Sequence, residues 1–404
     1  MKIFLVDNKV YSYDDLLKDI NHQDYYCKLH KTTDLYKYFL NFLVGLLSDK
    51  PLTLIDSDIN ENEINALGIN EINVKESIQK TDFEKIEKVI EKIEKSLSEI
   101  SIFTSGTTGQ PKNVKHNIAT LTRSVRIDQK YSKQIWAFAY NPTHMAGLQV
   151  FFQVFMNTGA MVNVFNQTRQ NVYNLIEKYD IDHISATPTF YRLLLPVEKA
   201  YQQVVRVTFG GEKSDAKLYD AILKIFPNAK INNIYASTEA GSLFYAKGEY
   251  FVIPTSIKER VKIIDNEILL HKSLLGKSEN LLLDGEYYHT GDLIEWQNQE
   301  DGLFRFVSRK NELINVGGYK INPQEVRDVI LTIDGIQDAV VYAKANSVLG
   351  NILCADIKAF SENNLTEIQI RNILSTKLQE FKIPRRIKFV DELLLTRTGK
   401  IQTK

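Results

Sequence analysis

Cysteine is scarce in this sequence, which has only 2 in 404 residues, Cys27 and Cys354. Two thiols so far apart exclude a disulfide framework and a thiolate metal site, so we expect a reducing environment. An excess of one charge is also missing, because 50 Lys and Arg residues balance 50 Asp and Glu residues. With a formal net charge of zero, the chain has no overall field that would recruit nucleic acid or an anionic membrane.

Long apolar runs are absent as well. No window approaches the run of about 20 apolar residues that a membrane-spanning helix needs. The N-terminus, MKIFLVDNKVYSYDD, meets Asp7 too early for a signal peptide. We therefore expect a soluble, cytoplasmic protein that binds neither nucleic acid nor membrane.

The sequence nevertheless contains enough apolar material for a large core. A hydrophobic content of 44% over this length predicts two or three domains. Strand-like apolar runs alternate with helix-like segments, which is typical of an α/β fold. The expected strands are 135–139, 181–186, 204–209 and 231–237, and the expected helices are 172–179 and 217–226. Loops at the ends of such strands commonly carry the chemistry.

The pattern changes after Asp292. Short strands surround the turn at 298–302, and Pro323 opens a helix with Glu325 in its first turn. Further strands are expected at 338–345, 352–360 and 385–390, with a helix at 366–381. We expect a compact α+β unit here and place the boundary near Lys310-Asn311. The Lys/Glu-rich run 81–99 is expected to form a helix with a solvated face.

The segment Ile102 to Lys112, IFTSGTTGQPK, predicts an anion-binding loop. Gly, Ser and Thr allow several backbone N–H groups and hydroxyls to converge on one anion, and polyphosphate is the natural ligand. The loop is not a Walker A motif, since Pro111 precedes the lysine. An ordinary flexible turn is the alternative that composition alone leaves open.

Other segments point to one family. The informative stretches are TSGTTGQPK (104–112), PTHMAG (142–147), YASTE (235–239), HTGDL (289–293), SRKN through GGYKINPQE (308–325) and TRTGKI (396–401). In this order they resemble the motifs of the adenylate-forming (AMP-binding) superfamily, which includes acyl- and aryl-CoA synthetases, nonribosomal-peptide adenylation domains and firefly luciferase. The resemblance implies a large N-terminal multilayer α/β domain, residues 1–310, and a small mobile C-terminal α+β domain, residues 311–404. The phosphate loop begins early, so the chain looks like a compact member.

The resemblance also implies a phosphate and metal site. Thr238 would contact the α-phosphate of ATP, and Glu239 would hold Mg²⁺. Taken alone, Thr238-Glu239 would equally suit a helix N-cap with an acidic first turn. The β- and γ-phosphates would be wrapped by the loop residues Thr104, Ser105, Gly106, Thr107, Thr108, Gly109 and Lys112.

Nucleoside binding is implied for a further set of residues. Asp292 would accept hydrogen bonds from both ribose hydroxyls, with Arg309 as a second ribose contact, although an Asp in HTGDL could also be a plain turn residue. The adenine ring would lie against Tyr235, and Asn233 would bond its amino edge. Backbone would approach the ring at the turn formed by Gly210, Gly211 and Glu212.

Two residues are assigned to the reaction itself. Lys400 would be a mobile charge placed between the carboxylate and the α-phosphate when the small domain closes. A solvated C-terminal lysine is the alternative. The small domain would turn about Asn311, after which the Gly317-Gly318 loop would line a pantetheine tunnel gated by His144. A satisfied loop or core histidine is the alternative for His144.

These observations favour an ATP-dependent acid–thiol ligase. A carboxylic acid would be activated as acyl-AMP and passed to the pantetheine thiol of CoA or of a carrier protein. The segment Ala139 to Val150 lacks the Asp that amino-acid adenylation domains usually place there, which favours acyl or aryl acids. Two alternatives remain: an adenylation enzyme that loads an amino or aryl acid onto a carrier protein, and an inactive nucleotide-binding scaffold.

Overall fold

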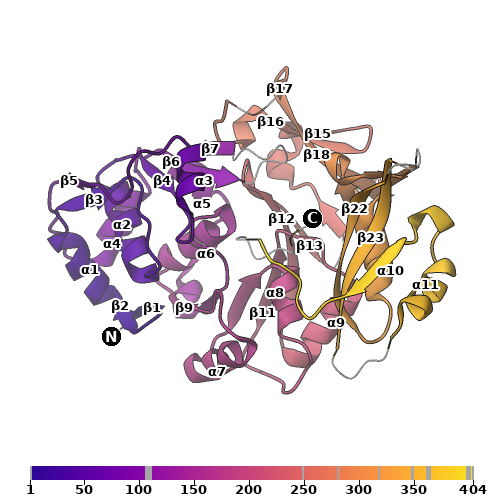
Figure 1. Cartoon of the computed structure of the whole chain (residues 1–404). Coiled ribbons are helices and arrows are strands. Elements are labelled where there is room, and N and C mark those ends of the chain that lie inside the picture. Colours follow the sequence, from indigo (N-terminus) through magenta and orange to yellow (C-terminus); the bar gives the residue numbers. More distant parts are fainter. Residues whose placement is uncertain are drawn as a thin grey trace.

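The computed structural model describes residues 2–104, 112–247, 250–279, 281, 283–316, 319–346, 350–360, 365–396 and 402. Within these residues a 14-stranded mixed sheet forms the body of the molecule, with the N-terminal segments packed on one side and the C-terminal segments on the other (Figure 1). None of the described helices is long and apolar enough to span a membrane.

The middle of the large sheet is parallel, with neighbours in the order β12-β11-β10-β8-β9-β1. Successive parallel strands need crossover connections, and helices supply them here. The elements are β1 (Ile3–Val6), β8 (Ile135–Phe138), α6 (Met145–Phe155), β9 (Ala160–Asn163), α7 (Arg169–Tyr179), β10 (His183–Ala186), α8 (Pro188–Leu193), β11 (Arg206–Gly210), α9 (Ala216–Ile225) and β12 (Lys230–Ser237). The alternation expected from the sequence is confirmed, with ends displaced by one to three residues.

An antiparallel wing continues the sheet from β12, and a short hairpin strand closes the other edge against β1. A separate apolar cluster fills this wing, with Phe244 and Phe304 fully buried. The strands are β13 (Gly241–Lys247), β14 (Tyr250–Val252), β15 (Val261–Ile264), β16 (Glu267–His271), β17 (Leu283–Asp284), β18 (Tyr287–Asn298) and β19 (Leu303–Arg309), with β2 (Val10–Ser12) at the far edge.

The N-terminal part packs an aromatic layer against α6. Phe39 stacks on Phe151 with ring centroids 4.2 Å apart, and both are fully buried. The expected helix at 81–99 is shorter than predicted: only 86–93 is helical, and its buried face is Val89, Ile90 and Ile93. The elements are α1 (Tyr13–His22), β3 (Tyr25–Cys27), α2 (Leu35–Leu47), β4 (Leu52–Leu54), α3 (Glu61–Ala66), β5 (Lys75–Ser77), α4 (Ile86–Ile93), β6 (Ile100–Thr104), β7 (Lys112–His116) and α5 (Ile118–Thr122).

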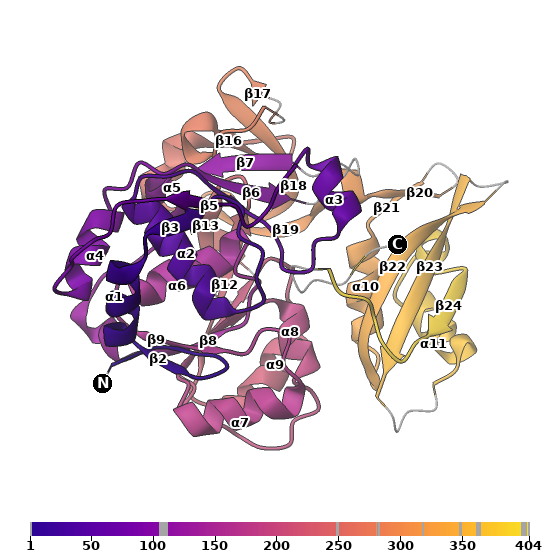
Figure 2. The ribbon, with the colours of Figure 1, turned by 60° about the vertical axis from the view of Figure 1, so that its left-hand side comes forward.

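The C-terminal segments form an α+β unit with its own core, seen at the right of Figure 2. Its second helix is shorter than the predicted 366–381, because the chain leaves the helix after Ser375 and Phe381 instead stacks on Tyr319 at 4.3 Å. The elements are β20 (Ile314–Val316), β21 (Tyr319–Ile321), α10 (Pro323–Leu331), β22 (Ile336–Asn346), β23 (Gly350–Ala359), α11 (Glu367–Ser375) and β24 (Arg386–Phe389).

Helix α10 of this unit contacts α9 and the turn before it. Lys213 Nζ lies 2.7 Å from Asp328 Oδ2. Lys217 Nζ donates to the carbonyl of Leu331 at 3.0 Å, where the C-terminus of α10 offers unpaired carbonyls and a partial negative charge. These contacts define the orientation of the C-terminal unit in this structure.

Candidate active site

The parallel strands bring several of the predicted residues to one edge of the sheet. His144 lies beyond the end of β8, the Gly210–Glu212 turn follows β11, and Thr238-Glu239 follows β12. Strands β8, β10, β11 and β12 are parallel neighbours, so their carboxyl ends share this edge. In open α/β sheets, ligands bind outside the carboxyl ends of the strands.

Asp292 joins two other predicted residues at this edge. Its carboxylate accepts a hydrogen bond from the Tyr235 hydroxyl at 2.5 Å and another from Arg309 Nε at 2.6 Å. The residue is only 5% exposed and lies in β18, opposite Arg309 of β19, so it is not a plain turn residue. Burial lowers the pKa of Arg309, but the charge of Asp292 outweighs this and raises it above its ordinary value.

The ring of Tyr235, predicted to lie against adenine, is packed against other aromatic rings of the protein. Its ring stacks between Phe306 at 4.4 Å and Phe244 at 5.2 Å. Burial and the neighbouring Asp292 carboxylate raise the pKa of Tyr235 well above its ordinary value. The hydroxyl therefore stays neutral and remains a donor to Asp292.

Thr238 and Glu239 lie in the turn between β12 and β13, so the helix N-cap alternative is wrong. Their carbonyls are both held: His116 Nε2 is 2.8 Å from Thr238 O, and the N–H of Gly276 donates to Glu239 O at 2.7 Å. Burial lowers the pKa of His116 to about 4, so the ring is neutral at pH 7 and Nε2 carries the donated proton.

Sequence reasoning missed His116. It closes β7, the second strand of the predicted phosphate hairpin, and its ring is packed against Gly276, where an added Cβ would lie 2.5 Å from the ring. The hairpin and the Thr238 turn are thereby joined. His116 and Thr238 are 122 residues apart, so sequence spacing alone did not indicate their contact.

The carboxylate of Glu239 faces the same region as Asp292. Its charge contributes to the raised pKa values of Tyr235 and Tyr288, which also respond to Asp292. Among the ion pairs of the described residues, none involves Glu239. A protein-only group of three or more metal ligands is not found in the described part of the chain.

The predicted phosphate loop connects β6 and β7, which pair antiparallel with Thr104 opposite Lys112. The loop residues Ser105, Gly106, Thr107, Thr108 and Gly109 lie outside the described residues, as do Gly317, Gly318 and Lys400. In this register Lys112 lies directly beside Thr104, so both ends of the predicted loop are close together.

The predicted adenine-side residues Asn233 and Glu212 are each hydrogen-bonded to other residues of the protein. Asn233 is 6% exposed, and its Nδ2 donates to Ser214 Oγ at 3.1 Å. Glu212 Oε2 accepts from the backbone and hydroxyl of Thr189 at 3.0 and 2.7 Å. Gly211 has a φ of +83°, a conformation that favours glycine. The Glu212 side chain therefore fixes the turn after β11.

His144 directly precedes α6, and its side chain lies against Asp56, a residue that sequence reasoning also missed. His144 Nε2 is 3.3 Å from Asp56 Oδ1, and the same oxygen accepts from Asn141 Nδ2 at 3.0 Å and from the Thr143 hydroxyl. Burial would raise the pKa of Asp56, but His144 and the other donors outweigh it and lower the pKa to about 2. An Asp directly after the apolar run LTLI of β4 was the available signal.

Two models of known protein families match this chain. Residues 60–267 match the AMP-binding enzyme family, and residues 325–400 match the AMP-binding enzyme C-terminal domain. The chain belongs to the AMP-binding enzyme family.

Individual members of this AMP-binding family are distant from the chain. A probable acyl-activating enzyme 4 of Arabidopsis thaliana is 26% identical over 74% of this chain and 63% of its own length. A 2-succinylbenzoate–CoA ligase of Staphylococcus aureus is 26% identical over 74% of this chain and 65% of its own length. The chain thus spans just under two thirds of these curated relatives.

Solved structures share the adenylate-forming fold. The o-succinylbenzoate coenzyme A synthetase of Bacillus subtilis, in complex with ATP and magnesium ion, has a TM-score of 0.71 and 17% identity, covering 99% of this chain and 95% of that one. The fold prediction, a large α/β body with a C-terminal unit, is confirmed.

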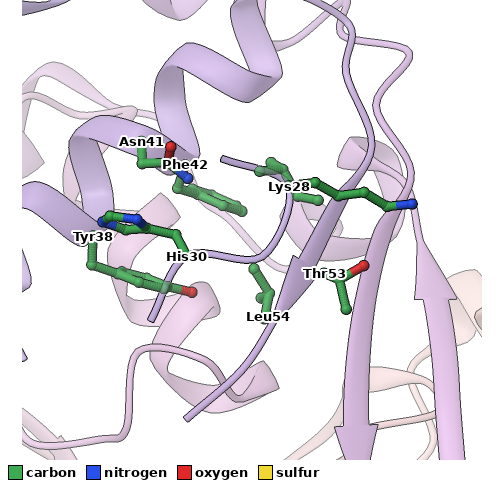
Figure 3. Close-up of a pocket in the computed structure, with 8 residues that line it drawn as sticks. Lys28, His30, Tyr38, Asn41, Phe42, Thr53 and Leu54 are labelled. Atoms are coloured by element: carbon green, nitrogen blue, oxygen red, sulfur yellow. The ribbon is translucent and has the colours of Figure 1, made fainter. Parts of the chain in front are cut away.

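A small cavity of about 10 Å³ lies in the N-terminal part of this AMP-binding fold, between α2 and β4 (Figure 3). Tyr38 lines it and donates its hydroxyl to the carbonyl of Pro142 at 3.1 Å. The cavity therefore lies behind the segment that carries His144, and it is separate from the residues around Asp292.

Proposed function

We propose that the protein is an ATP-dependent acid–thiol ligase that activates an acyl or aryl acid as acyl-AMP. The observation that carries this proposal is the hydrogen-bonded group of Tyr235, Asp292 and Arg309 at the carboxyl edge of the sheet, beside Thr238-Glu239. A buried carboxylate and a fixed guanidinium beside an aromatic ring edge suit a nucleoside, and the adjacent turn and hairpin suit its phosphates.

In this proposal different residues bind the ribose, the base and the phosphates of ATP. Asp292 accepts hydrogen bonds from the ribose hydroxyls, and its carboxylate is oriented for them by the Tyr235 hydroxyl and Arg309 Nε. The edge of the Tyr235 ring, which is stacked between Phe306 and Phe244, borders the base together with Asn233 and the Gly210–Glu212 turn. The Thr104–Lys112 hairpin surrounds the β- and γ-phosphates.

The residues at the turn after β12 fit Mg²⁺. Glu239 supplies an anionic oxygen and Thr238 a hydroxyl, both of which are suitable ligands for a hard cation. Mg²⁺ would neutralise charge on the triphosphate. Thr238 would hold the α-phosphate, with its backbone fixed by His116.

Two bond-forming steps follow from this arrangement. In the first, a carboxylate oxygen bonds to the α-phosphorus while the bond to pyrophosphate breaks, and Lys400 stabilises the charge that develops between them. In the second, a thiol sulfur bonds to the acyl carbon, AMP leaves and the thiol proton is released. We propose that the C-terminal domain, residues 311–404, turns about Asn311 between the steps, with His144 and Gly317-Gly318 bordering the thiol path.

Free CoA is the proposed acceptor, because the curated relatives include a CoA ligase. A carrier-protein phosphopantetheine would present the same thiol, and an enzyme that loads a carrier is one outcome of the test. The thiol must be reduced, and both cysteines of this chain are free, so the cytoplasm is the proposed location.

The experiment is acid-dependent exchange of labelled pyrophosphate into ATP, measured with the purified protein over a panel of acyl, aryl and amino acids. An acid that supports exchange is then incubated with ATP and either CoA or a phosphopantetheinylated carrier, and the thioester is identified by mass spectrometry. The proposal predicts exchange with an acyl or aryl acid and a CoA thioester. ATP binding without exchange for any acid would contradict it and favour a scaffold.

A further inference from the structure

Glu267 has a buried carboxylate that the proposed reaction does not use. It opens β16 directly after Asp265 and Asn266, both of which have a positive φ. Its side chain is only 3% exposed. Burying an ionised carboxylate is costly unless charged or hydrogen-bonded groups surround it. The groups around Glu267 therefore indicate what this side chain holds in place.

Two of these groups belong to the segment that carries Asp292. Glu267 Oε1 accepts from the backbone N–H of Gly291 at 2.9 Å, and Oε2 accepts from His289 Nδ1 at 2.9 Å. Gly291 has a φ of +75°, so the carboxylate stabilises a left-handed turn. Because Gly291 immediately precedes Asp292, Glu267 sets the position of the carboxylate assigned to ribose.

The third group is Lys310, whose Nζ lies 2.7 Å from Glu267 Oε2. Lys310 directly follows Arg309, the second partner of Asp292. The Glu267 carboxylate thus contacts Gly291, which precedes Asp292, and Lys310, which follows Arg309. Burial would raise the pKa of Glu267, but the hydrogen bonds from Lys310, His289 and Gly291 outweigh it and lower the pKa. Glu267 is therefore charged at neutral pH.

We propose that Glu267 is a positioning residue that locks Lys310 to the large domain and keeps Arg309 beside Asp292 when the C-terminal unit turns about Asn311. This inference rests on the proposed function, since it concerns the same nucleotide site. A rotation that starts after Lys310 leaves both ion pairs intact, and the ribose stays held in either orientation. Without the lock, Arg309 would be carried away from Asp292 with the small unit.

The test measures ATP binding by calorimetry for the full chain and for Glu267→Gln, Lys310→Met and the double variant. Glutamine keeps the size of the side chain but removes its charge and turns an amide N–H toward the lysine. Glu267 accepts charge-assisted hydrogen bonds that glutamine cannot replace in full, so E267Q should weaken ATP binding about tenfold or more. K310M should weaken it less, about threefold. The double variant should bind like E267Q, because Lys310 has then already lost its partner.

Glu295→Gln is the matched control. Glu295 and Arg305 form an ion pair at 2.7 Å across the same strands, β18 and β19, and both side chains are about half exposed. This variant should bind ATP like the wild type. A loss comparable to that of E267Q would mean that any charge change on these strands disturbs the site, and would overturn the specific role of Glu267.

A kinetic readout separates positioning from a general structural role. In acid-dependent exchange, E267Q should raise the KM for ATP about tenfold and leave the KM for the acid within about twofold. Unchanged ATP binding in E267Q, equal rises in both KM values, or independent effects of E267Q and K310M would overturn the proposal. Lys310 is half exposed, so K310M tests the proposal even if E267Q does not fold. A wild type that binds ATP but exchanges with no acid would contradict the proposed function, while the binding comparison still decides the role of Glu267.

Discussion

Arg309 Nε lies 2.6 Å from Asp292 Oδ1, and the two residues are paired across β18 and β19. The same carboxylate accepts the Tyr235 hydroxyl through its other oxygen. Both oxygens are thus oriented before any ligand arrives, and such preorganisation lowers the entropy cost of binding. In the proposed function this group is the ribose site.

Asp292→Asn should therefore weaken ATP and AMP binding by about tenfold to a hundredfold, since two charge-assisted hydrogen bonds are lost. Calorimetric titration with AMP measures the effect without any reaction. Tyr235→Phe keeps the ring between Phe244 and Phe306 and removes one donor, so a smaller loss of about threefold to tenfold is expected. Equal binding by D292N and the wild type would contradict the assignment of the ribose site.

His116 should make stability depend on pH. Burial lowers its pKa in the folded state to about 4, below the ordinary histidine value of 6.5. Above pH 6.5 the His116 ring is neutral in both the folded and the unfolded protein, and its full contribution to stability is present. It is lost as the pH falls from 6.5 toward 4, because only the unfolded state gains the proton. Between pH 7.5 and pH 5 the free energy of unfolding should fall by about 2 kcal/mol from this residue.

Denaturant titrations of the wild type and His116→Gln at pH 7.5 and 5 test this prediction. Glutamine can still donate a hydrogen bond toward Thr238 O but does not titrate. The variant should lose about 2 kcal/mol less than the wild type on acidification. The same loss in both proteins would show that His116 titrates normally in the folded state.

Asp56 should matter for the position of His144 rather than for nucleotide binding. Asp56→Asn removes the charge that faces His144 Nε2 and leaves the donors of Asn141 and Thr143 poorly satisfied. We expect a loss of about 1–3 kcal/mol in the free energy of unfolding. In the proposed function, thioester formation should slow about tenfold, while pyrophosphate exchange should change less than threefold.

His144→Ala provides the comparison for the two half-reactions. If Asp56 acts through His144, the double variant Asp56→Asn with His144→Ala should transfer the acyl group to CoA no more slowly than His144→Ala alone. Additive losses in the double variant would mean that Asp56 supports the site by another route.

The orientation of the C-terminal unit should respond to the Lys213–Asp328 pair. Lys213→Asp places two carboxylates together, and the exchanged pair Lys213→Asp with Asp328→Lys restores attraction. A partly exposed ion pair contributes about 0.5–1 kcal/mol, so the single variant should shift the population of orientations about twofold to fivefold.

Energy transfer between dyes on cysteines introduced at the exposed positions Leu97 and Ile368 measures this shift. The native cysteines are buried and should not compete for the label. Recovery of the wild-type distribution in the exchanged variant is expected. The same distribution in all three proteins would show that this pair does not hold the C-terminal unit.

Local patterns predicted the elements of the fold but not their partners. The runs at 135–139 and 204–209 are buried strands, since apolar composition and flanking turns suffice to indicate them. The end of the helix predicted at 366–381 was wrong, because the stacking of Phe381 on Tyr319 is a tertiary contact. Propensity contains no information about such a contact.

The candidate site shows the same division. Tyr235, Asp292 and Arg309 were named from motifs, and they are hydrogen-bonded together. The residues that position the site were missed, because each acts across long stretches of chain: Asp56 is 88 residues from His144, and Glu267 is 43 residues from Lys310. Glu267 at a buried position of an apolar strand was the available signal, since an unpaired charge there would be costly.

The fate of the carboxylate oxygen tests the central claim most directly. An acid that supports exchange is labelled with ¹⁸O at both carboxyl oxygens, and the reaction with ATP and CoA is run to completion. The account predicts AMP that carries one ¹⁸O, because the acid attacks the α-phosphorus and AMP leaves with that oxygen. Unlabelled AMP, or label in inorganic phosphate instead, would contradict it.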